Sequence, residues 1–230
     1  MLYVIATPIG NLEDITLRAI RTLGEVDLVL AEDTRKTGML LARLNIKKKL
    51  ISFFEHSEEK KIPQIIDLLE EGENVALVSS AGAPTISDPG YKLVRECRRR
   101  KLPVTSIPGP SSIINALVLT SIAHDKFSFL GYMPRKSSAR KKMLEQAREN
   151  GATFIFLESP FRVKSTLEDL KTVLGNPKIA LAREMTKKFE EVLELSVDEA
   201  LAHYQQRKPK GEFTIIVENT TILKKKSIKS

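Results

Sequence analysis

The 230-residue sequence contains a single cysteine, Cys97, which excludes an intramolecular disulfide framework. So few thiols are typical of a protein from the reducing cytoplasm. Three histidines occur, His56, His124 and His203, and they are too widely separated to give a zinc-ligand spacing. We therefore expect an active site without a metal, and we expect Cys97 to fill space in a helix.

Long apolar runs and nucleotide-binding signatures are also missing from the sequence. No apolar stretch approaches the length of a membrane span, and no basic segment precedes the first apolar residues. We accordingly expect a soluble, unexported protein of the cytoplasm. No G-x-G-x-x-G follows the first apolar segment, and no G-x-x-x-x-G-K-[ST] occurs. A classical dinucleotide-binding fold and a P-loop nucleotidase are therefore not supported.

The charge balance favours a polyanionic partner. Lysine and arginine total 37 against 29 acidic residues, a formal net charge of +8. The length suits two domains of ordinary size. We predict an N-terminal α/β domain over residues 1–120 and a C-terminal α/β domain over 121–219. Residues 220–230 form a basic tail that we expect to be disordered.

Short apolar segments alternate with helical spacing through the first half, as expected of a parallel sheet. Its predicted strands are residues 2–6, 28–31, 51–54, 75–78 and 103–107. The polar loops that follow them should lie along one sheet edge, the usual ligand crevice of such folds. We predict that residues 79–84 and 108–112 meet there in one pocket. Helix ends are expected at Asp14 as a cap, at Gly24 after a helix, and near Ile62 because of Pro63.

The fourth predicted strand leads into the loop that organises this half. Residues 79–90 are rich in small side chains and contain Gly82, Pro84 and Pro89. Small residues leave backbone groups open to a close approach, and the prolines limit the freedom of the loop. An ordinary strand-to-helix connection would have a similar composition.

The second half opens with a basic segment, residues 134–142, that becomes a helix with Ser137 or Ser138 as its cap. Cations at a helix N-terminus oppose the helix dipole, so we favour phosphate contact over a merely solvated helix start. Three further motifs follow predicted strands or precede the last one. They are ESPFR (158–162), REMTKKFEE (183–191) and KGEF (210–213).

Together these motifs resemble the ribosomal RNA small-subunit methyltransferase I family, of the tetrapyrrole-methylase-like class of S-adenosylmethionine enzymes. The resemblance covers about residues 2–218 and also rests on TPIGNLEDIT (7–16), DTRKT (33–37), AGAPTISDPG (81–90) and IPGPS (107–111). It implies a parallel-sheet domain and a mixed-sheet domain, with the cofactor in the cleft between them. It also implies a homodimer that methylates the 2′-oxygen of a cytidine in the decoding region of 16S ribosomal RNA.

The sequence departs from the family pattern at three positions. Ser80 and Ala83 stand where the family usually has an acidic residue and a threonine, and Phe161 stands where it has a histidine. The first two changes fall in the cofactor loop. If the missing carboxylate or hydroxyl holds the cofactor, each lost hydrogen bond lowers the affinity by about tenfold or more. If backbone groups hold the cofactor, little changes. Phe161 excludes a catalytic histidine at its position.

Given this resemblance, the methyl donor is already activated, and the protein mainly orients donor and acceptor. The expected S-adenosylmethionine contacts are Pro8, Gly82, Ala83, Ile86, Ser111, Ser112 and Leu157. The candidate proton acceptors are strand-end carboxylates: Glu184, Asp33 and Glu158 first, with Glu32 and Asp88 also available. For each of them, capping a helix or pairing with a nearby arginine is the alternative role.

The RNA contacts are expected from cations at the strand-end loops, which would position a phosphate backbone. They are Arg35, Arg135, Lys136, Arg162, Arg183, Lys187 and Lys188. Surface ion pairs with Glu184, Glu190 and Glu191 are the competing explanation. The aromatic residues Phe53, Phe54, Phe161 and Phe189 are candidates for stacking on a base, although Phe53 fits a core position better.

Three functional hypotheses follow. The first is the RNA 2′-O-methyltransferase, acting on the small ribosomal subunit. The second keeps the fold and cofactor but methylates a small tetrapyrrole, against which the +8 charge argues. The third is a ribosome-binding relative that has lost catalysis, suggested by Ser80 and Ala83.

Overall fold

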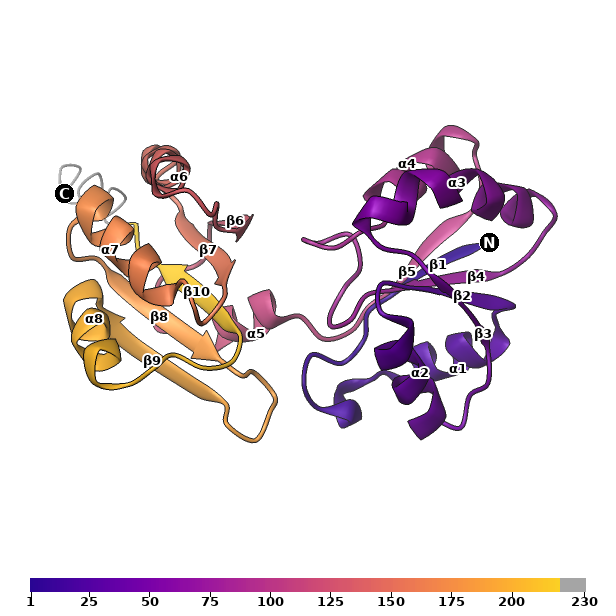
Figure 1. The fold of residues 1–230 in the computed structure, drawn as a ribbon, viewed down its shortest axis with the longest axis horizontal. Coiled ribbons are helices and arrows are strands. Elements are labelled where there is room, and N and C mark those ends of the chain that lie inside the picture. Colours follow the sequence, from indigo (N-terminus) through magenta and orange to yellow (C-terminus); the bar gives the residue numbers. More distant parts are fainter. Residues whose placement is uncertain (220–230) are drawn as a thin grey trace. The chain divides into compact units, whose positions relative to one another are not determined.

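The computed structural model describes residues 1–219, which fall into two compact units (Figure 1). The first unit is Met1–Ser111, and the second begins at Ser112. Our predicted boundary after residue 120 would place helix α5 (Ser112–Val118) in the first domain, whereas α5 packs against strand β10 (Phe213–Val217) of the second unit. The tail at residues 220–230, predicted to be disordered, lies outside the described residues.

The segment after α5 is also held by the second unit. The Glu194 carboxylate accepts hydrogen bonds from the hydroxyls of Thr120 (2.9 Å) and Ser121 (2.5 Å), and it pairs with the Lys178 ammonium at 2.6 Å. The Lys178 ammonium and the bonds from Ser121 and Thr120 hold the pKa of Glu194 down to about 2, against the opposing effect of desolvation. A charged carboxylate therefore fixes the start of the second unit.

The first unit is built on a five-stranded sheet of order β3-β2-β4-β1-β5, in which every neighbouring pair is parallel. This confirms the parallel sheet predicted from the alternation of strands and helices. The ends of the central strands are level, since Ile5 lies opposite both Val78 and Ile107. The strands are β1 (Leu2–Ile5), β2 (Leu28–Ala31), β3 (Lys49–Ser52), β4 (Val75–Val78) and β5 (Val104–Ile107).

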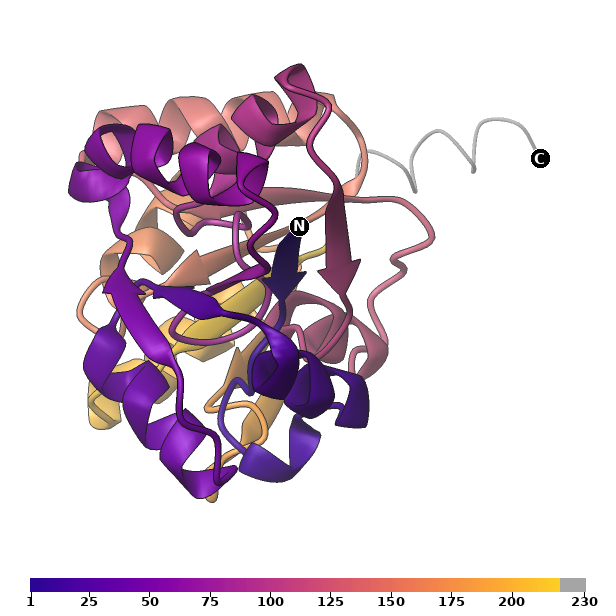
Figure 2. The same ribbon diagram turned by 90° about the vertical axis from the view of Figure 1, so that its right-hand side faces the viewer.

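Helices cover both faces of this sheet, as Figure 2 shows. Alternate residues of each strand point to opposite faces, so Leu28 and Leu30 enter one core cluster while Val29 and Ala31 enter the other. The side chains of α3 and α4 fill the first cluster, and those of α1 and α2 fill the second. The helices are α1 (Leu17–Glu25), α2 (Thr34–Arg43), α3 (Glu55–Glu70) and α4 (Tyr91–Arg99), with a short 3-10 helix η1 (Leu12–Asp14) before α1.

Three predicted helix ends in this unit are wrong. Thr16, not Asp14, caps α1, because its hydroxyl accepts a hydrogen bond from Ala19 N at 3.1 Å while Asp14 belongs to η1. Gly24 lies inside α1, which continues to Glu25. Helix α3 already begins at Glu55 and includes Pro63. Local propensity misplaced these ends, since packing of the helix faces sets where each helix stops.

The second unit has a mixed sheet of order β6-β7-β10-β8-β9. Strands β6 and β7 are parallel, and β10 is antiparallel to both β7 and β8, which confirms the predicted mixed sheet. One face packs on α6, α7 and α8 around Phe154, Phe156 and Phe213 (Figure 1). The bounds are β6 (Phe127–Tyr132), α6 (Ser137–Glu149), β7 (Thr153–Glu158), α7 (Val163–Leu174), β8 (Lys178–Arg183), β9 (Glu191–Ser196) and α8 (Val197–Gln206).

A buried ion pair joins α6 to α7. The Arg140 guanidinium lies 2.5 Å from the Asp169 carboxylate, with both side chains under a tenth exposed. Ser137 donates its hydroxyl to the same carboxylate at 2.8 Å, and the residue at the cap position is Lys136, which makes no side-chain cap. The predicted cap at Ser137 or Ser138 is therefore wrong, because the buried carboxylate takes the Ser137 hydroxyl.

Candidate functional site

The loops that follow β1 and β4 meet at the carboxyl edge of the first sheet. Thr7 N donates to Gly82 O at 2.9 Å, and Gly82 N donates back to Thr7 O at 3.0 Å. The Thr7 hydroxyl donates to Ser79 O at 3.2 Å, and the Ser79 hydroxyl donates to the carbonyl of Gly82 at 3.2 Å. Backbone and hydroxyl groups therefore hold the two loops together, without a charged side chain.

The loop after β5 joins them. A Cβ added to Gly109 would lie 3.0 Å from the Cβ of Ala6, so this glycine allows the loop to approach the end of β1. A Cβ added to Gly82 would lie 3.5 Å from Ile9 and 3.8 Å from the Pro110 carbonyl oxygen. The loops after β1, β4 and β5 thus converge, as predicted from the parallel sheet.

The β4–α4 loop has an unusual backbone. Thr85 and Ser87 have positive φ angles of 73° and 62°, in a region that is rare for any residue with a Cβ and rarest for a β-branched one. Strain of this kind persists only where surrounding structure imposes it, and it concentrates at functional sites. Between the two strained residues, Ile86 is half exposed.

Two carboxylates tie the ends of this loop to the unit. Ser80 N donates to a Glu32 carboxylate oxygen at 3.0 Å, and Gly90 N donates to Glu58 Oε1 at 3.1 Å. Glu58 is buried and lies on α3. No sequence pattern indicated this contact of Glu58, since its partner is 32 residues away.

A third carboxylate, Asp88, interacts with Glu32. Desolvation by burial, and then the charge of Glu32, raise the pKa of Asp88 to about 6, while a hydrogen bond with the Ser79 side chain opposes the shift. A carboxyl group of this pKa exchanges a proton close to neutral pH. The carboxyl edge of the first sheet therefore combines closely packed loops of small residues with a pair of interacting acidic groups.

The predicted cofactor residues belong to both units. Pro8, Gly82, Ala83 and Ile86 lie in the converging loops, and Ser111 ends the first unit. Gly82 is buried with a positive φ of 77°, and its N–H and C=O are both bonded to Thr7, so this glycine shapes the loop. Ser112 begins α5 and Leu157 lies in β7, both in the second unit.

The three leading catalytic candidates all have partners within the protein. Asp33 caps α2 by accepting from Arg35 N (2.9 Å) and Lys36 N (3.2 Å), and those bonds lower its pKa. Glu158 is buried and pairs with Arg162 at 2.7 Å. Glu184 pairs with Lys187 at 3.0 Å. Helix capping and ion pairing, the expected alternatives to catalysis, are therefore the roles that these carboxylates have in the structure.

The predicted RNA contacts divide into paired and exposed cations. Arg162 is bound to Glu158, Arg183 lies 3.2 Å from Glu191, and Lys187 lies between Glu184 and Glu212. Ion pairing within the protein therefore explains why these three cations lie at the strand-end loops. The other four are exposed at loops or at the start of a helix, and Arg35, with its side chain 91% exposed, is 3.7 Å from Asp33. They are Arg35, Arg135, Lys136 and Lys188.

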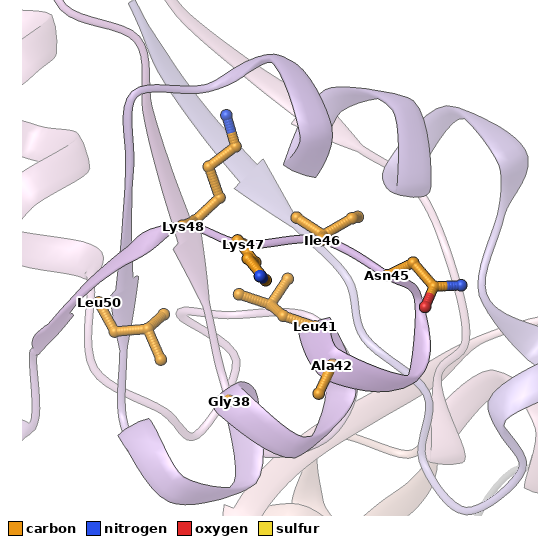
Figure 3. A pocket seen from close by; sticks show the side chains of 8 residues that line it. All are labelled: Gly38, Leu41, Ala42, Asn45, Ile46, Lys47, Lys48 and Leu50. Carbon is orange, nitrogen blue, oxygen red and sulfur yellow. The ribbon is translucent and has the colours of Figure 1, made fainter.

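One cavity of about 550 Å³ lies elsewhere in the first unit, between α2 and the start of β3 (Figure 3). Leu41, Ile46 and Leu50 form its apolar walls, and Lys47 and Lys48 also line it. It is at the amino end of β3, whereas the converging loops follow the carboxyl ends of their strands. No motif of the sequence indicated it.

Among residues 1–219, no group of three or more histidine, cysteine or acidic side chains is arranged to hold a metal ion. Within the same range, no helix combines the length and the apolar character needed to cross a membrane. Cys97 is buried, and desolvation raises the pKa of its thiol to about 11, so it is a filling residue as expected.

Comparison with known proteins identifies the group to which this arrangement belongs. Residues 1–201 match the model of a family described as tetrapyrrole (corrin/porphyrin) methylases. A Thermotoga maritima protein named ribosomal RNA small subunit methyltransferase I is 46% identical over 216 residues, which cover 94% of this chain and 97% of that protein. A Haemophilus influenzae protein of the same name is 46% identical over 222 residues, covering 95% and 78%.

Solved structures show the same fold at low identity. The methyltransferase CobJ superposes with a TM-score of 0.71 at 15% identity, covering 95% of this chain and 93% of that one. A diphthine synthase gives a TM-score of 0.70 at 13% identity, covering 95% and 90%. With this fold and these relatives, the chain belongs to the ribosomal RNA small subunit methyltransferase I family, within the tetrapyrrole methylases.

Proposed function

We propose that this protein transfers a methyl group from S-adenosylmethionine to the ribose 2′-oxygen of a cytidine in the decoding region of 16S ribosomal RNA. The observation that carries the proposal is the 46% identity, across nearly the whole chain, to proteins named for small-subunit ribosomal RNA methylation. We further propose that it acts as a homodimer on the small ribosomal subunit, in the cytoplasm.

The converging loops of the first unit fit S-adenosylmethionine. Gly82 and Gly109 keep the β1, β4 and β5 loops close together without side chains between them, so a ligand at this edge can approach the backbone closely. Pro8 and Ile86 offer apolar contacts, and the acidic pair Glu32 and Asp88 suits a ligand with positive charge. When bound, this cofactor supplies a methyl group activated by a positive sulfonium.

The residues of this chain then have to orient the acceptor and receive its proton. A ribose hydroxyl is a poor nucleophile, so a nearby carboxylate helps by accepting the proton as the new bond forms. Asp88 suits this task better than Asp33, Glu158 or Glu184, because it forms no ion pair within residues 1–219 and its pKa is raised to about 6. Because residue 161 is a phenylalanine, no imidazole is available at that position to accept the proton.

The exposed cations support an RNA acceptor over a tetrapyrrole. Arg135 and Lys136 lie on the loop before α6, and Arg140 fixes this loop by donating to the carbonyls of Pro134 (3.2 Å) and Arg135 (3.1 Å). A fixed, basic loop positions a phosphate backbone, and the +8 net charge acts in the same direction.

The test is transfer of labelled methyl from S-adenosylmethionine to undermethylated small ribosomal subunits, to naked 16S RNA and to a uroporphyrin-type tetrapyrrole. We expect label in the subunits, and resistance of one cytidine linkage to alkaline cleavage, because a 2′-O-methyl group blocks that reaction. An Asp88→Ala variant should transfer methyl more slowly, while Lys47→Ala, at the remote cavity, should match the native protein. Label in the tetrapyrrole alone would disprove the proposal.

Loss of catalysis is the second candidate function, favoured by Ser80 and Ala83 in the cofactor loop. Ser80 contributes its backbone N–H to Glu32, so its side chain is not needed for that contact. Calorimetry with S-adenosylmethionine decides between the two. Binding at micromolar cofactor supports the enzyme, whereas no heat at millimolar cofactor would support a ribosome-binding protein without activity.

A further inference from the structure

The second unit displays aromatic side chains along one edge of its sheet. Strands β7 and β8 are both antiparallel to β10, and β6 is parallel to β7, so β6, β7 and β8 all end at the same edge. Tyr132 ends β6, Phe161 follows β7 and Phe189 follows β8, with exposed fractions of 56%, 86% and 66%. We call this the aromatic edge.

Several polar contacts hold the turn that carries Phe161. Arg162 pairs with the buried Glu158 at 2.7 Å and donates to the carbonyl of Met133 at 2.8 Å. Its backbone N–H also donates to Ser159 O at 3.0 Å, which closes the turn. The partners of Arg162 therefore hold an exposed phenyl ring on a fixed backbone, beside the basic loop that follows Met133.

The turn that carries Phe189 is fixed in a different way. The Lys187 ammonium lies 3.0 Å from Glu184 and 2.9 Å from Glu212, and Glu190 N donates to Lys187 O at 3.1 Å. Glu184 has a positive φ of 53° and packs so closely on Gly211 that a Cβ added there would lie 2.5 Å from its side chain. These contacts tie the loop at several points although it lies at the surface.

Cations are interleaved with the rings. The Lys188 ammonium is 5.7 Å from the centroid of the Phe189 ring, and Arg135 and Lys136 are exposed just after Tyr132 and Met133. Across residues 1–219, no ion pair is formed by Lys188, Arg135 or Lys136. An apolar protein partner would leave these charges without a partner. A strand of nucleic acid uses both the rings and the cations, because its bases stack on aromatic side chains and its phosphates attract positive charge.

We propose that the aromatic edge binds a single-stranded RNA segment, with bases stacked on Phe161 and Phe189 and phosphates contacted by Lys188, Arg135 and Lys136. The proposal rests on the proposed function and adds to it the surface that holds the acceptor strand. Because the backbone of both turns is held before binding, little backbone conformational entropy is lost when a base stacks on these rings. Stacking is also tolerant of sequence, so this surface supplies affinity, and selection of the nucleotide takes place elsewhere.

The test compares Phe161→Leu, Phe189→Leu and their combination with Phe127→Leu. Phe127 is a matched control, because it is an exposed phenylalanine at the start of β6 and hence at the opposite edge of the same sheet. Binding of a fluorescein-labelled 12-nucleotide single-stranded RNA is followed by anisotropy. We expect each edge variant to weaken binding about tenfold and the control to leave it unchanged. The salt dependence should stay the same, since no charge is removed.

A spectroscopic measurement separates stacking from general packing. A 2-aminopurine base in the oligonucleotide should be quenched by the native protein and by Phe127→Leu, and less by the double edge variant. Equal affinity and equal quenching for all variants would overturn the proposal. So would a change from dimer to monomer in the edge variants with RNA affinity retained, because the edge would then be an interface between copies.

Failure of the aromatic edge can be distinguished from failure of the proposed function. Anisotropy reports RNA binding whether or not methyl is transferred, so a native protein that fails to methylate the small subunit disproves the function and leaves the binding comparison to decide the edge. If the native protein methylates the subunit, the edge variants should raise KM with kcat little changed. Unchanged KM would count against the aromatic edge alone.

Discussion

The two units use different means to fix the loops at the carboxyl ends of their strands. In the first, the β1, β4 and β5 loops are joined by backbone hydrogen bonds and by contacts of Gly82 and Gly109, and the carboxylates of Glu32 and Glu58 accept from backbone N–H groups. In the second, the loops are fixed by ion pairs between side chains, Arg140 with Asp169 and Arg162 with Glu158. A surface left open for a small ligand needs the first arrangement, whereas a surface that presents rings and cations can tolerate the second.

Because of this contrast, charged side chains on strand-end loops have different roles in the two units. In the second unit, charge on a strand-end loop is often structural, as with Lys187 between Glu184 and Glu212. In the first unit, the pair Glu32 and Asp88 costs electrostatic free energy, since one raises the pKa of the other. A charged pair that is unfavourable for folding is the better candidate for a functional role.

The largest expected effect tests the ion pair of the second unit. Arg140→Leu leaves the buried Asp169 carboxylate without its main partner, and we expect a loss of about 3–5 kcal/mol in the free energy of unfolding. Urea denaturation followed by circular dichroism measures it. Lys141→Met is the control, because Lys141 is 3.6 Å from the same carboxylate but 37% exposed. Equal losses in the two variants would remove the distinction between buried and exposed charge.

The next effect tests the close backbone packing of the first unit. Gly90 has a φ of 124°, and a Cβ there would lie 2.5 Å from Leu77 Cδ2. We expect Gly90→Ala to destabilise the protein by roughly 1–3 kcal/mol through strain and the contact with Leu77. Gly72→Ala separates the two causes, since Gly72 also has a positive φ but has open space around it. Equal losses of unfolding free energy in Gly90→Ala and Gly72→Ala would show that the contact with Leu77 contributes nothing.

A smaller effect tests the acidic pair. Because the pKa of Asp88 is raised above 3.8 to about 6, its contribution to stability is present below about pH 4 and is lost as the pH rises toward 6. Asp88→Asn keeps the neutral form, so its melting temperature should exceed that of the native protein above pH 6. With Asp88 partly exposed, we expect a gain of roughly 1 kcal/mol.

The pH dependence gives the control for this variant. The difference in melting temperature between Asp88→Asn and the native protein should grow between pH 4 and pH 6.5 and then stay constant. A difference that does not depend on pH would mean that Asp88 titrates normally. Scanning calorimetry at five pH values is sufficient to decide.

The smallest effect compares two adjacent lysines of the β8–β9 loop. Lys188 is exposed and Lys187 is paired with two carboxylates, so only Lys188→Ala should reduce the salt dependence of RNA binding, by about 0.7 in the slope of log K against log salt. Lys187→Ala should leave that slope unchanged. A larger change for Lys187→Ala would mean that RNA displaces Glu184 and Glu212 from it. Fluorescence anisotropy from 50 to 200 mM salt measures both.

Much of the first unit could be predicted from sequence, because its determinants are local. Four consecutive apolar residues, as in Val75–Val78, predict a buried strand, and the strands Leu28–Ala31 and Val75–Val78 were predicted to the residue. Alternation with helices then requires parallel strands and places their loops at one edge. The small residues around Gly82 mark which of those loops can hold a ligand. The convergence of three loops followed from these facts alone.

The tertiary structure alone decided which charged residues are available. Asp169 and Arg140 are 29 residues apart, and Lys187 and Glu212 are 25 apart. No local pattern reports such pairs, because an ion pair depends on where two elements pack and how deeply each side chain is buried. For the same reason, the sequence identified Arg162 and Arg183 as RNA contacts although both are paired within the protein, and it could not rank Asp88 above Glu158. Composition and periodicity determined the fold and its loops; long-range packing determined which side chains on those loops face solvent.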